Sequence, residues 1–294
     1  LDDAPSTEYF VYRNDQVTNP AGECGVDIEP VKHNENNGII DNGTGDCGGL
    51  CVAQVGCDAD VEFYQDFGSS VTAVENRINL IINTTSSQYE SQCGIELEVS
   101  GIVVRTAEPD PYTSNDGGTM LSQIQSEWQS NQGAIPHDIV HLFTGKNIVD
   151  GGDPNVIGIA FVGVVCANSG VGTVENFSPN SCAFDLSAHE IGHNWSATHC
   201  CAGTTMNAGL TCANNFAQQS IDQIVAHRNS RTCLDPALTT LNLPFFDDFP
   251  NLTLDSTKWS ASGAAPSTVG NGEPSAPNSL RIRGTQSIFS AHLD

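Results

Sequence analysis

The chain has 294 residues, enough for one large domain or for a main domain with smaller attachments. Its 35 acidic and 10 basic residues give a formal net charge of −25, which repels nucleic acid and anionic membranes, so we expect neither as a partner. A solubilising acidic surface explains this charge more simply than any single partner does, although calcium or cationic substrates would also suit it. No apolar run is long enough for a transmembrane span, and any signal peptide has been removed or lies outside this sequence.

The eleven cysteines indicate disulfide bonds formed in an oxidising compartment. They form no CxxC pair, so a zinc ribbon is disfavoured. We therefore expect a secreted, extracellular protein. The odd count leaves at least one sulfur unpaired if all bridges are internal.

The composition of the first half of the chain changes near residue 50. Residues 1–46 are rich in Asn, Asp, Gly and Pro and predict an extended segment. A strand is predicted over residues 50–55, followed by a turn or loop over residues 58–67. Apolar residues at helical spacing predict a long helix over residues 70–90. Apolar and charged residues then alternate over residues 95–99, which predicts a strand with one face exposed to solvent. Whether the strand continues to residue 104 is left open.

The second half continues the alternation of strands and helices. Gly158 and Gly163 interrupt one apolar run, which indicates an edge strand that a ligand backbone can approach. This alternation predicts an α/β (α+β) fold with a largely parallel sheet, followed by a loop-rich part stapled by disulfides. The predicted elements are a helix over 120–128 entered through the turn at Asp116, strands over 139–143 and 156–165, and helices over 184–194 and 216–228.

Composition divides the chain into four parts. After the extended segment 1–46, residues 47–236 form the main domain and residues 237–244 a linker. Residues 245–294 are rich in Ser, Gly, Pro and Asn and contain short apolar runs. Since a β-sandwich takes about 100 residues, this part is predicted to be a fragment of a sandwich-like accessory module.

The stretch from His189 to His199 carries the chemistry. On a helix, His189 and His193 are one turn apart, so both imidazoles can reach one zinc ion. Glu190 lies next to the first ligand, where it can act as general base towards a water whose pKa zinc lowers to about 7. Since each helical residue turns by about 100°, the chain must turn after Asn194 to bring His199 to the same ion.

The third histidine distinguishes this stretch from a chance match. A lone HExxH pattern occurs often on ordinary helices, whereas a third His at this spacing is far more specific. His137 and His141 are also four residues apart, but they stand in a β-branched run that predicts a strand. There the two residues lie about 13 Å apart, so a structural role is expected for them.

The motif resembles the extended zinc motif of the metzincins, and its surroundings are most similar to the reprolysin or adamalysin branch. The likeness covers residues 50–233. It implies a twisted, mostly parallel five-stranded sheet with an antiparallel edge strand, an active-site helix, a small loop-rich C-terminal subdomain and endopeptidase activity. It further implies that the edge strand pairs with an extended substrate through Gly158, Ile159 and Ala160, and that Met206 forms the Met-turn beneath the zinc.

Two residues depart from the family pattern. Ser196 stands where the family has Gly, and a positive φ there costs Ser about a kcal/mol. Cys200 replaces the Asp that usually follows the third ligand, so the local disulfide pairing is not transferred. The resemblance does imply a disulfide between Cys166 and Cys233.

Cys24, followed by Gly25 and Val26, resembles the cysteine switch of metzincin pro-segments. In that reading residues 1–46 are the end of a pro-segment, and the Cys24 thiolate is a fourth zinc ligand in a latent form. The count agrees, since the other ten cysteines suffice for five bridges. The alternative is that Cys24 forms a surface disulfide with Cys47 or Cys51.

These features predict a secreted zinc-dependent metalloendopeptidase, made as a zymogen, that is monomeric and acts on proteins or peptides. One alternative is a zinc hydrolase with a non-peptide substrate; another is an adhesion or matrix-binding protein with a vestigial metal site. An intact Glu190 disfavours the second. Calcium is a possible further ion. Its candidate ligands are Asp58, Asp60, Asp150 and Asp153.

Overall fold

The computed structural model describes residues 23–24, 47, 49–237, 259–262, 267–270, 278–281 and 287–290. The chain divides into two units, Leu1–Pro236 and Ala237–Asp294. The described part of the second unit consists of two antiparallel strand pairs. Their strands are β8 (Trp259–Ser262) with β11 (Ser287–Ser290), and β9 (Ser267–Gly270) with β10 (Asn278–Arg281).

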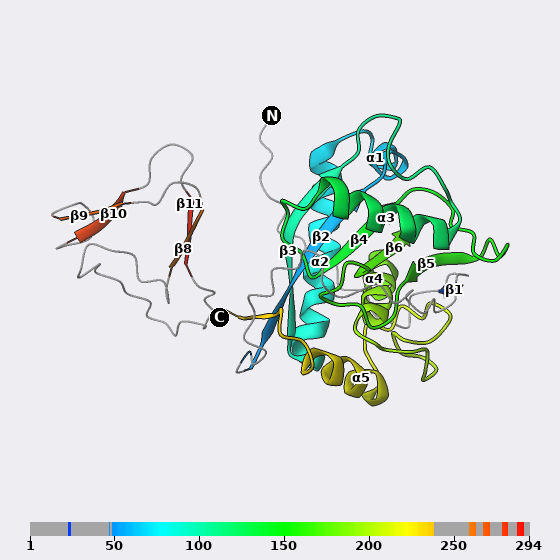
Figure 1. Ribbon diagram of the computed structural model, residues 1–294. Helices are drawn as coiled ribbons and strands as arrows, with labels where there is room; N and C mark the ends of the chain where they lie inside the picture. Colours follow the sequence, from blue (N-terminus) through cyan, green and yellow to red (C-terminus); the bar gives the residue numbers. More distant parts are fainter. Residues whose placement is uncertain are drawn as a thin grey trace. The chain divides into compact units, whose positions relative to one another are not determined.

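One sheet organises the first unit (Figure 1), in the strand order β1-β5-β6-β4-β2-β3. Strands β3, β2, β4 and β6 are parallel, and β5 runs antiparallel to β6. The mostly parallel five-stranded sheet with an antiparallel edge strand is therefore confirmed for the longer strands. These are β2 (Cys51–Ala59), β3 (Ile95–Val104), β4 (Ile139–Thr144), β5 (Val156–Ala160) and β6 (Val171–Glu175).

Two short strands extend this sheet. β7 (Asp235–Pro236) pairs antiparallel with β2. β1 (Glu23–Cys24) pairs parallel with β5 and so adds to the outer edge of the sheet.

Helices cover both faces of the sheet. Along β4, Ile139 and Phe143 pack in a core cluster with α2 (Val71–Cys93) and α4 (Asn180–Asn194), whereas Leu142 packs in a second cluster with α3 (Gly117–Asn131). Because alternate residues of a strand point to opposite faces, the fold has three layers. The helix α5 (Gln218–Arg228) packs against α2. Within the described residues, no helix is both long and apolar enough to span a bilayer.

The predicted loop over residues 58–67 is wrong. The strand β2 continues to Ala59, and the short helix α1 (Val61–Asp66) follows directly. The Asp60 carboxylate accepts a hydrogen bond of 2.8 Å from the Phe63 amide, so it caps the helix, and Val61 and Phe63 are buried beneath it. A short capped helix of this kind leaves no extended hydrophobic period in the sequence.

The predicted strand over residues 156–165 ends early, at Ala160. Gly163 has a φ of 70°, and its amide donates to the His193 carbonyl at 2.9 Å. The Val164 amide donates to the Asn194 carbonyl, also at 2.9 Å. The chain therefore leaves the sheet because the end of α4 offers carbonyl acceptors, and it returns as β6, a strand that the pattern did not predict.

Three disulfides occur among the described residues: Cys47–Cys51, Cys166–Cys233 and Cys182–Cys212. The bridge between Cys166 and Cys233 is confirmed. The expected five bridges are not formed, because Cys57 and Cys93 are buried as free thiols in β2 and at the end of α2, and two further thiols, Cys200 and Cys201, are also free. The parity argument for Cys24 therefore fails. The alternative partners of Cys24, however, bond to each other.

Candidate metal centre

The histidines of the motif converge on one point. The helix α4 holds His189 and His193 one turn apart, with their Nε2 atoms 3.0 Å from each other. The Nε2 atom of His199 lies 3.2 Å from that of His189. Among the described residues, His189, His193 and His199 form a potential metal-binding group whose ligand atoms all lie within 4.8 Å of one another.

A tight turn brings His199 back to the helix. The helix ends at Asn194, and the Ala197 amide donates to the Gly192 carbonyl at 2.9 Å. Ser196, within this turn, has a φ of 70°. The turn required after Asn194 is therefore present, and Ser occupies the left-handed conformation that glycine adopts most easily.

Hydrogen bonds fix which ring nitrogens face the centre. The Nδ1 atom of His189 lies 2.6 Å from the Thr205 carbonyl oxygen, and that of His193 lies 2.8 Å from the Ala197 carbonyl oxygen. Because a carbonyl oxygen only accepts, both Nδ1 atoms are assigned a proton, which leaves the Nε2 lone pairs of neutral rings pointing at each other. Burial lowers the pKa of His189 well below its usual value, and the neighbouring His193 adds to this effect, so the neutral ligand form is favoured.

The three rings fit a zinc ion. Lone pairs that face each other at 3.0 Å repel unless a cation lies between them. A tetrahedral ion with Zn–N bonds of about 2.0–2.1 Å would separate its nitrogens by about 3.3–3.4 Å, close to the spacing found here. His189, His193 and His199 are therefore the residues that would hold the metal.

Glu190 is buried between α4 and the edge strand β5. A Cβ atom at Gly158 would lie 2.8 Å from Cδ of the Glu190 side chain, and glycine is thus required for the strand to pass this close to the carboxylate. The proposed general base and the proposed substrate-binding strand are in direct contact. This contact has no sequence signal other than the glycine itself.

Met206 packs against the backbone of α4 from the loop that follows His199. It is buried, and its sulfur would lie 2.7 Å from a Cβ atom at Gly192, between the first two ligands. The Met206 carbonyl accepts a hydrogen bond of 2.9 Å from the Cys200 amide. Met206 thus supports the helical turn that carries His189 and His193, where the resemblance assigns a Met-turn.

The edge strand β5 contains Gly158, Ile159 and Ala160, and β6 covers one of its edges. On the other edge, Cys24 is paired with Gly158 in the register between β1 and β5 (Figure 1). The backbone of the predicted switch residue thus lies beside the glycine that contacts Glu190. The Cys24 side chain lies outside the described residues.

The candidate calcium ligands do not form a metal site together, and two of them bind other side chains. The Asp58 carboxylate accepts hydrogen bonds from Arg105, Tyr112 and Trp128. Asp60 caps α1 and forms a salt bridge with Lys146. In the part of the chain that the structure describes, none of Asp58, Asp60, Asp150 and Asp153 belongs to a potential metal-binding group, so calcium at these residues has no support.

His137 and His141 belong to no potential metal-binding group of the described residues either. His141 is buried in β4, with Nε2 3.3 Å from the Ser187 hydroxyl, and burial lowers its pKa to about 3. A structural role fits this environment.

Sequence reasoning missed the residues that orient the ligands. The carbonyl groups of Thr205 and Ala197 bind the histidine rings, and a backbone carbonyl leaves no signature in a sequence. His227, which bonds to Ser196, stands in α5 without any motif. Asp185 did carry a signal, since it lies four residues before His189 and therefore on the same helical face.

Comparison with known proteins agrees with this site. The model of metallo-peptidase family M12 (Reprolysin_5) matches residues 52–235, which include all three histidines and Glu190. Human (Homo sapiens) disintegrin and metalloproteinase domain-containing protein 9 is 28% identical over 181 residues, which make up 55% of this chain and 20% of that protein. The chain thus spans about a fifth of the length of this relative. The resemblance to reprolysins is confirmed, and the family implies a metallopeptidase that uses zinc. The chain belongs to metallo-peptidase family M12.

Proposed function

We propose that the protein is a zinc-dependent endopeptidase that hydrolyses internal peptide bonds with Glu190 as general base. The observation that carries this proposal is the convergence of three Nε2 atoms beside a buried carboxylate and an edge strand. Membership of a peptidase family favours a protein or peptide substrate over the non-peptide hydrolase and the adhesion protein.

The residues divide the work between them. When bound by His189, His193 and His199, zinc supplies the positive charge that makes a water nucleophilic near neutral pH. The Glu190 carboxylate accepts the proton of the attacking water and delivers it to the leaving amine. The strand β5 binds the substrate as an added strand, through the backbone of Gly158, Ile159 and Ala160.

The pairing of β1 with β5 supports a latent form. The segment at Glu23–Cys24 occupies the edge of β5 at which an extended substrate would add. A thiolate tethered there has a high effective concentration as a fourth zinc ligand, and it competes with water. We therefore propose that residues 1–46 hold the enzyme as a zymogen and that Cys24 is the switch. The three disulfides support secretion.

Glu190→Gln tests the catalytic role. The amide is nearly isosteric but cannot accept a proton, so cleavage of a denatured protein should fall by about 10²-fold or more while the zinc content stays at the parent level. Mass spectrometry of the products should show internal cleavage sites that disappear with a chelator. A variant with nearly full activity, or products trimmed only from the chain ends, would contradict the proposal.

Removal of residues 1–46 tests latency. The shortened chain should be active without further treatment, and Cys24→Ala in the full chain should raise basal activity. Cys24→Ser is a matched variant, since a hydroxyl is a poor zinc ligand, and it should behave like the Ala variant. Equal activity of the full and shortened chains would contradict the proposed switch at Cys24, and the peptidase assignment would still stand.

A further inference from the structure

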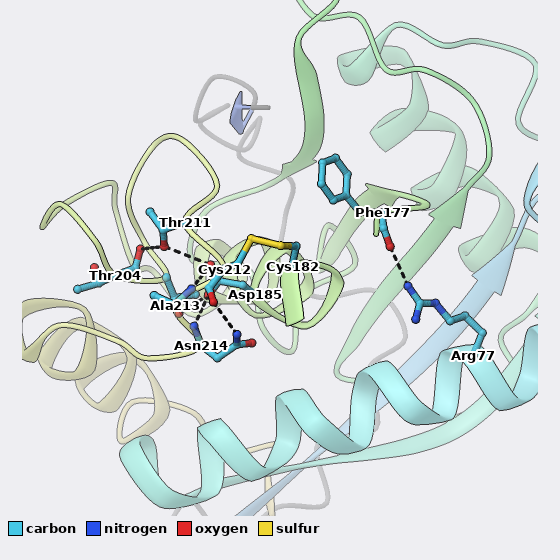
Figure 2. The surroundings of a disulfide bond; sticks show 10 residues. Arg77, Phe177, Cys182, Asp185, Thr204, Thr211, Cys212, Ala213 and Asn214 are labelled. Atoms are coloured by element: carbon cyan, nitrogen blue, oxygen red, sulfur yellow. Dashed lines mark hydrogen bonds between the residues drawn. A yellow bond between two sulfur atoms is a disulfide. The ribbon is translucent and has the colours of Figure 1, made fainter. Parts of the chain in front are cut away.

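Asp185 is a buried carboxylate on α4, one turn before His189, with none of its residue surface exposed (0%). Among the described residues, its hydrogen-bond donors come from the loop over residues 204–214, and Figure 2 shows Thr211, Ala213 and Asn214 of this loop beside the carboxylate. The donors are the Thr205 hydroxyl at 2.7 Å and the Asn214 amide at 3.0 Å on Oδ1, with the Ala213 amide at 3.1 Å and the Thr211 hydroxyl at 3.3 Å on Oδ2.

Thr205 joins this carboxylate to the metal centre. Its hydroxyl donates to Asp185 and accepts a hydrogen bond of 3.0 Å from the Gln88 side chain. Its carbonyl oxygen lies 2.6 Å from Nδ1 of His189. The next residue, Met206, packs on α4 between the ligands. A displacement of Thr205 therefore moves the acceptor that orients His189.

We propose that Asp185 is a positioning residue for the metal centre: it holds the loop that carries Thr205 and thereby orients His189 as a ligand. This inference rests on the proposed zinc site, whose first ligand shares a helical face with Asp185. Outer partners of metal-bound histidines typically change metal affinity by about 10–100-fold when they are removed.

Both oxygens of the Asp185 carboxylate accept hydrogen bonds, whereas an amide side chain would offer only one acceptor oxygen. Burial raises the pKa of Asp185, while the surrounding donors oppose this rise. The backbone amides of Ala213 and Asn214 only donate, and they reach different oxygens of the carboxylate. In Asp185→Asn, one of them would face an NH₂ group whichever way the side chain turned. The salt bridges found among the described residues do not include Asp185.

The loop has a second anchor that is independent of Asp185. Cys182 is three residues before Asp185, on the same face of α4, and it is bonded to Cys212 (Figure 2). When the carboxylate is altered, the disulfide keeps the loop attached to the helix. The variant therefore changes the position of the loop while the covalent link preserves the fold.

The experiment measures zinc affinity of the full chain by competition with a chromophoric chelator. Asp185→Asn should raise the zinc Kd by about 10–100-fold, whereas the control Asp222→Asn, an exposed position on α5, should leave it unchanged. Hydrogen exchange of amides 204–214 should become faster in the Asp185 variant at a temperature where it remains folded.

A second variant covers the case in which Asp185→Asn does not fold. Thr205→Val removes the hydroxyl donor and keeps the carbonyl that binds His189, so it should raise the zinc Kd in the same direction. In the double variant the two effects should be less than additive, because they act on one contact. A zinc Kd within twofold of the parent in both folded variants would overturn the proposal.

The readout separates this inference from the proposed function. If the parent binds zinc and the variants bind it more weakly, Asp185 positions the site even if no peptide is cleaved. If the parent cleaves protein and both variants keep its zinc affinity, the peptidase assignment stands and the role of Asp185 is wrong.

Discussion

The Ser196 hydroxyl lies 2.9 Å from Nδ1 of His227, and this contact joins the turn between two proposed metal ligands to the helix α5. Ser196 has a φ of 70°, a conformation that costs a residue with a side chain about 1–2 kcal/mol. A hydrogen bond to a partly buried imidazole contributes about 0.5–1.5 kcal/mol and offsets much of that cost. The departure from the family's glycine is therefore accommodated by a partner that lies 31 residues further along the chain.

Substitution of Ser196 separates the cost of its backbone strain from the gain of its hydrogen bond to His227. Ser196→Ala keeps the strained φ and loses the hydrogen bond, so the free energy of unfolding should fall by about 1 kcal/mol. Ser196→Gly also loses the bond but relieves the strain, so it should be more stable than the Ala variant by about 0.5–1 kcal/mol. Urea denaturation of the zinc-loaded proteins measures both. A Gly variant that is less stable than the Ala variant would refute this account of the turn.

His199→Ala should remove most of the bound zinc. Three protein ligands leave little redundancy, and His199 is the ligand that depends on the turn rather than on the helix. Metal analysis after dialysis checks this loss. His137→Ala is the matched control, because that ring bonds to the Ile135 carbonyl and lies outside the triad. Full zinc retention in the His199 variant would count against the assigned ligands.

Gly158→Ala should impair turnover more than metal binding. The added methyl group would overlap the Glu190 side chain, and a base displaced by about 1 Å can cost about 10²-fold in rate. We expect kcat/KM to fall by at least about 10-fold with the zinc content unchanged. Gly133→Ala is the control, because a Cβ atom there has no neighbour within 4 Å. Comparable activity in the two variants would show that the contact has no catalytic consequence.

His141 predicts a loss of stability in acid. Burial lowers its pKa from 6.5 to about 3, so the folded state resists protonation that the unfolded state accepts. The contribution is complete above about pH 6.5 and declines as the pH falls towards 3, by up to about 1.4 kcal/mol per pH unit. The variant His141→Gln does not titrate, so its unfolding free energy should depend less steeply on pH between 6.5 and 4. Parallel curves for the two proteins would show that His141 takes up its proton at the same pH in the folded and unfolded states.

Local spacing in the sequence predicts the three histidines of the proposed site, which the structure brings together. His189 and His193 share a helical face because 3.6 residues make one turn, and the position of His199 requires a turn after Asn194 whatever the rest of the fold does. The alternation of strands and helices likewise predicts a mostly parallel sheet, because period and connection length are local properties. These features depend on neighbours in the chain.

Contacts between distant segments set the features that local spacing does not predict. The strand predicted to run to residue 165 ends at Ala160 because the carbonyl groups at the end of α4 bind the amides of the following loop. The contact between Gly158 and Glu190 and the anchoring of Thr205 by Asp185 likewise join segments that approach only in the folded chain. Sequence periodicity reports the local conformation of one segment, whereas hydrogen-bond partners and steric limits between segments are set by packing, and packing is not encoded in any single stretch of the chain.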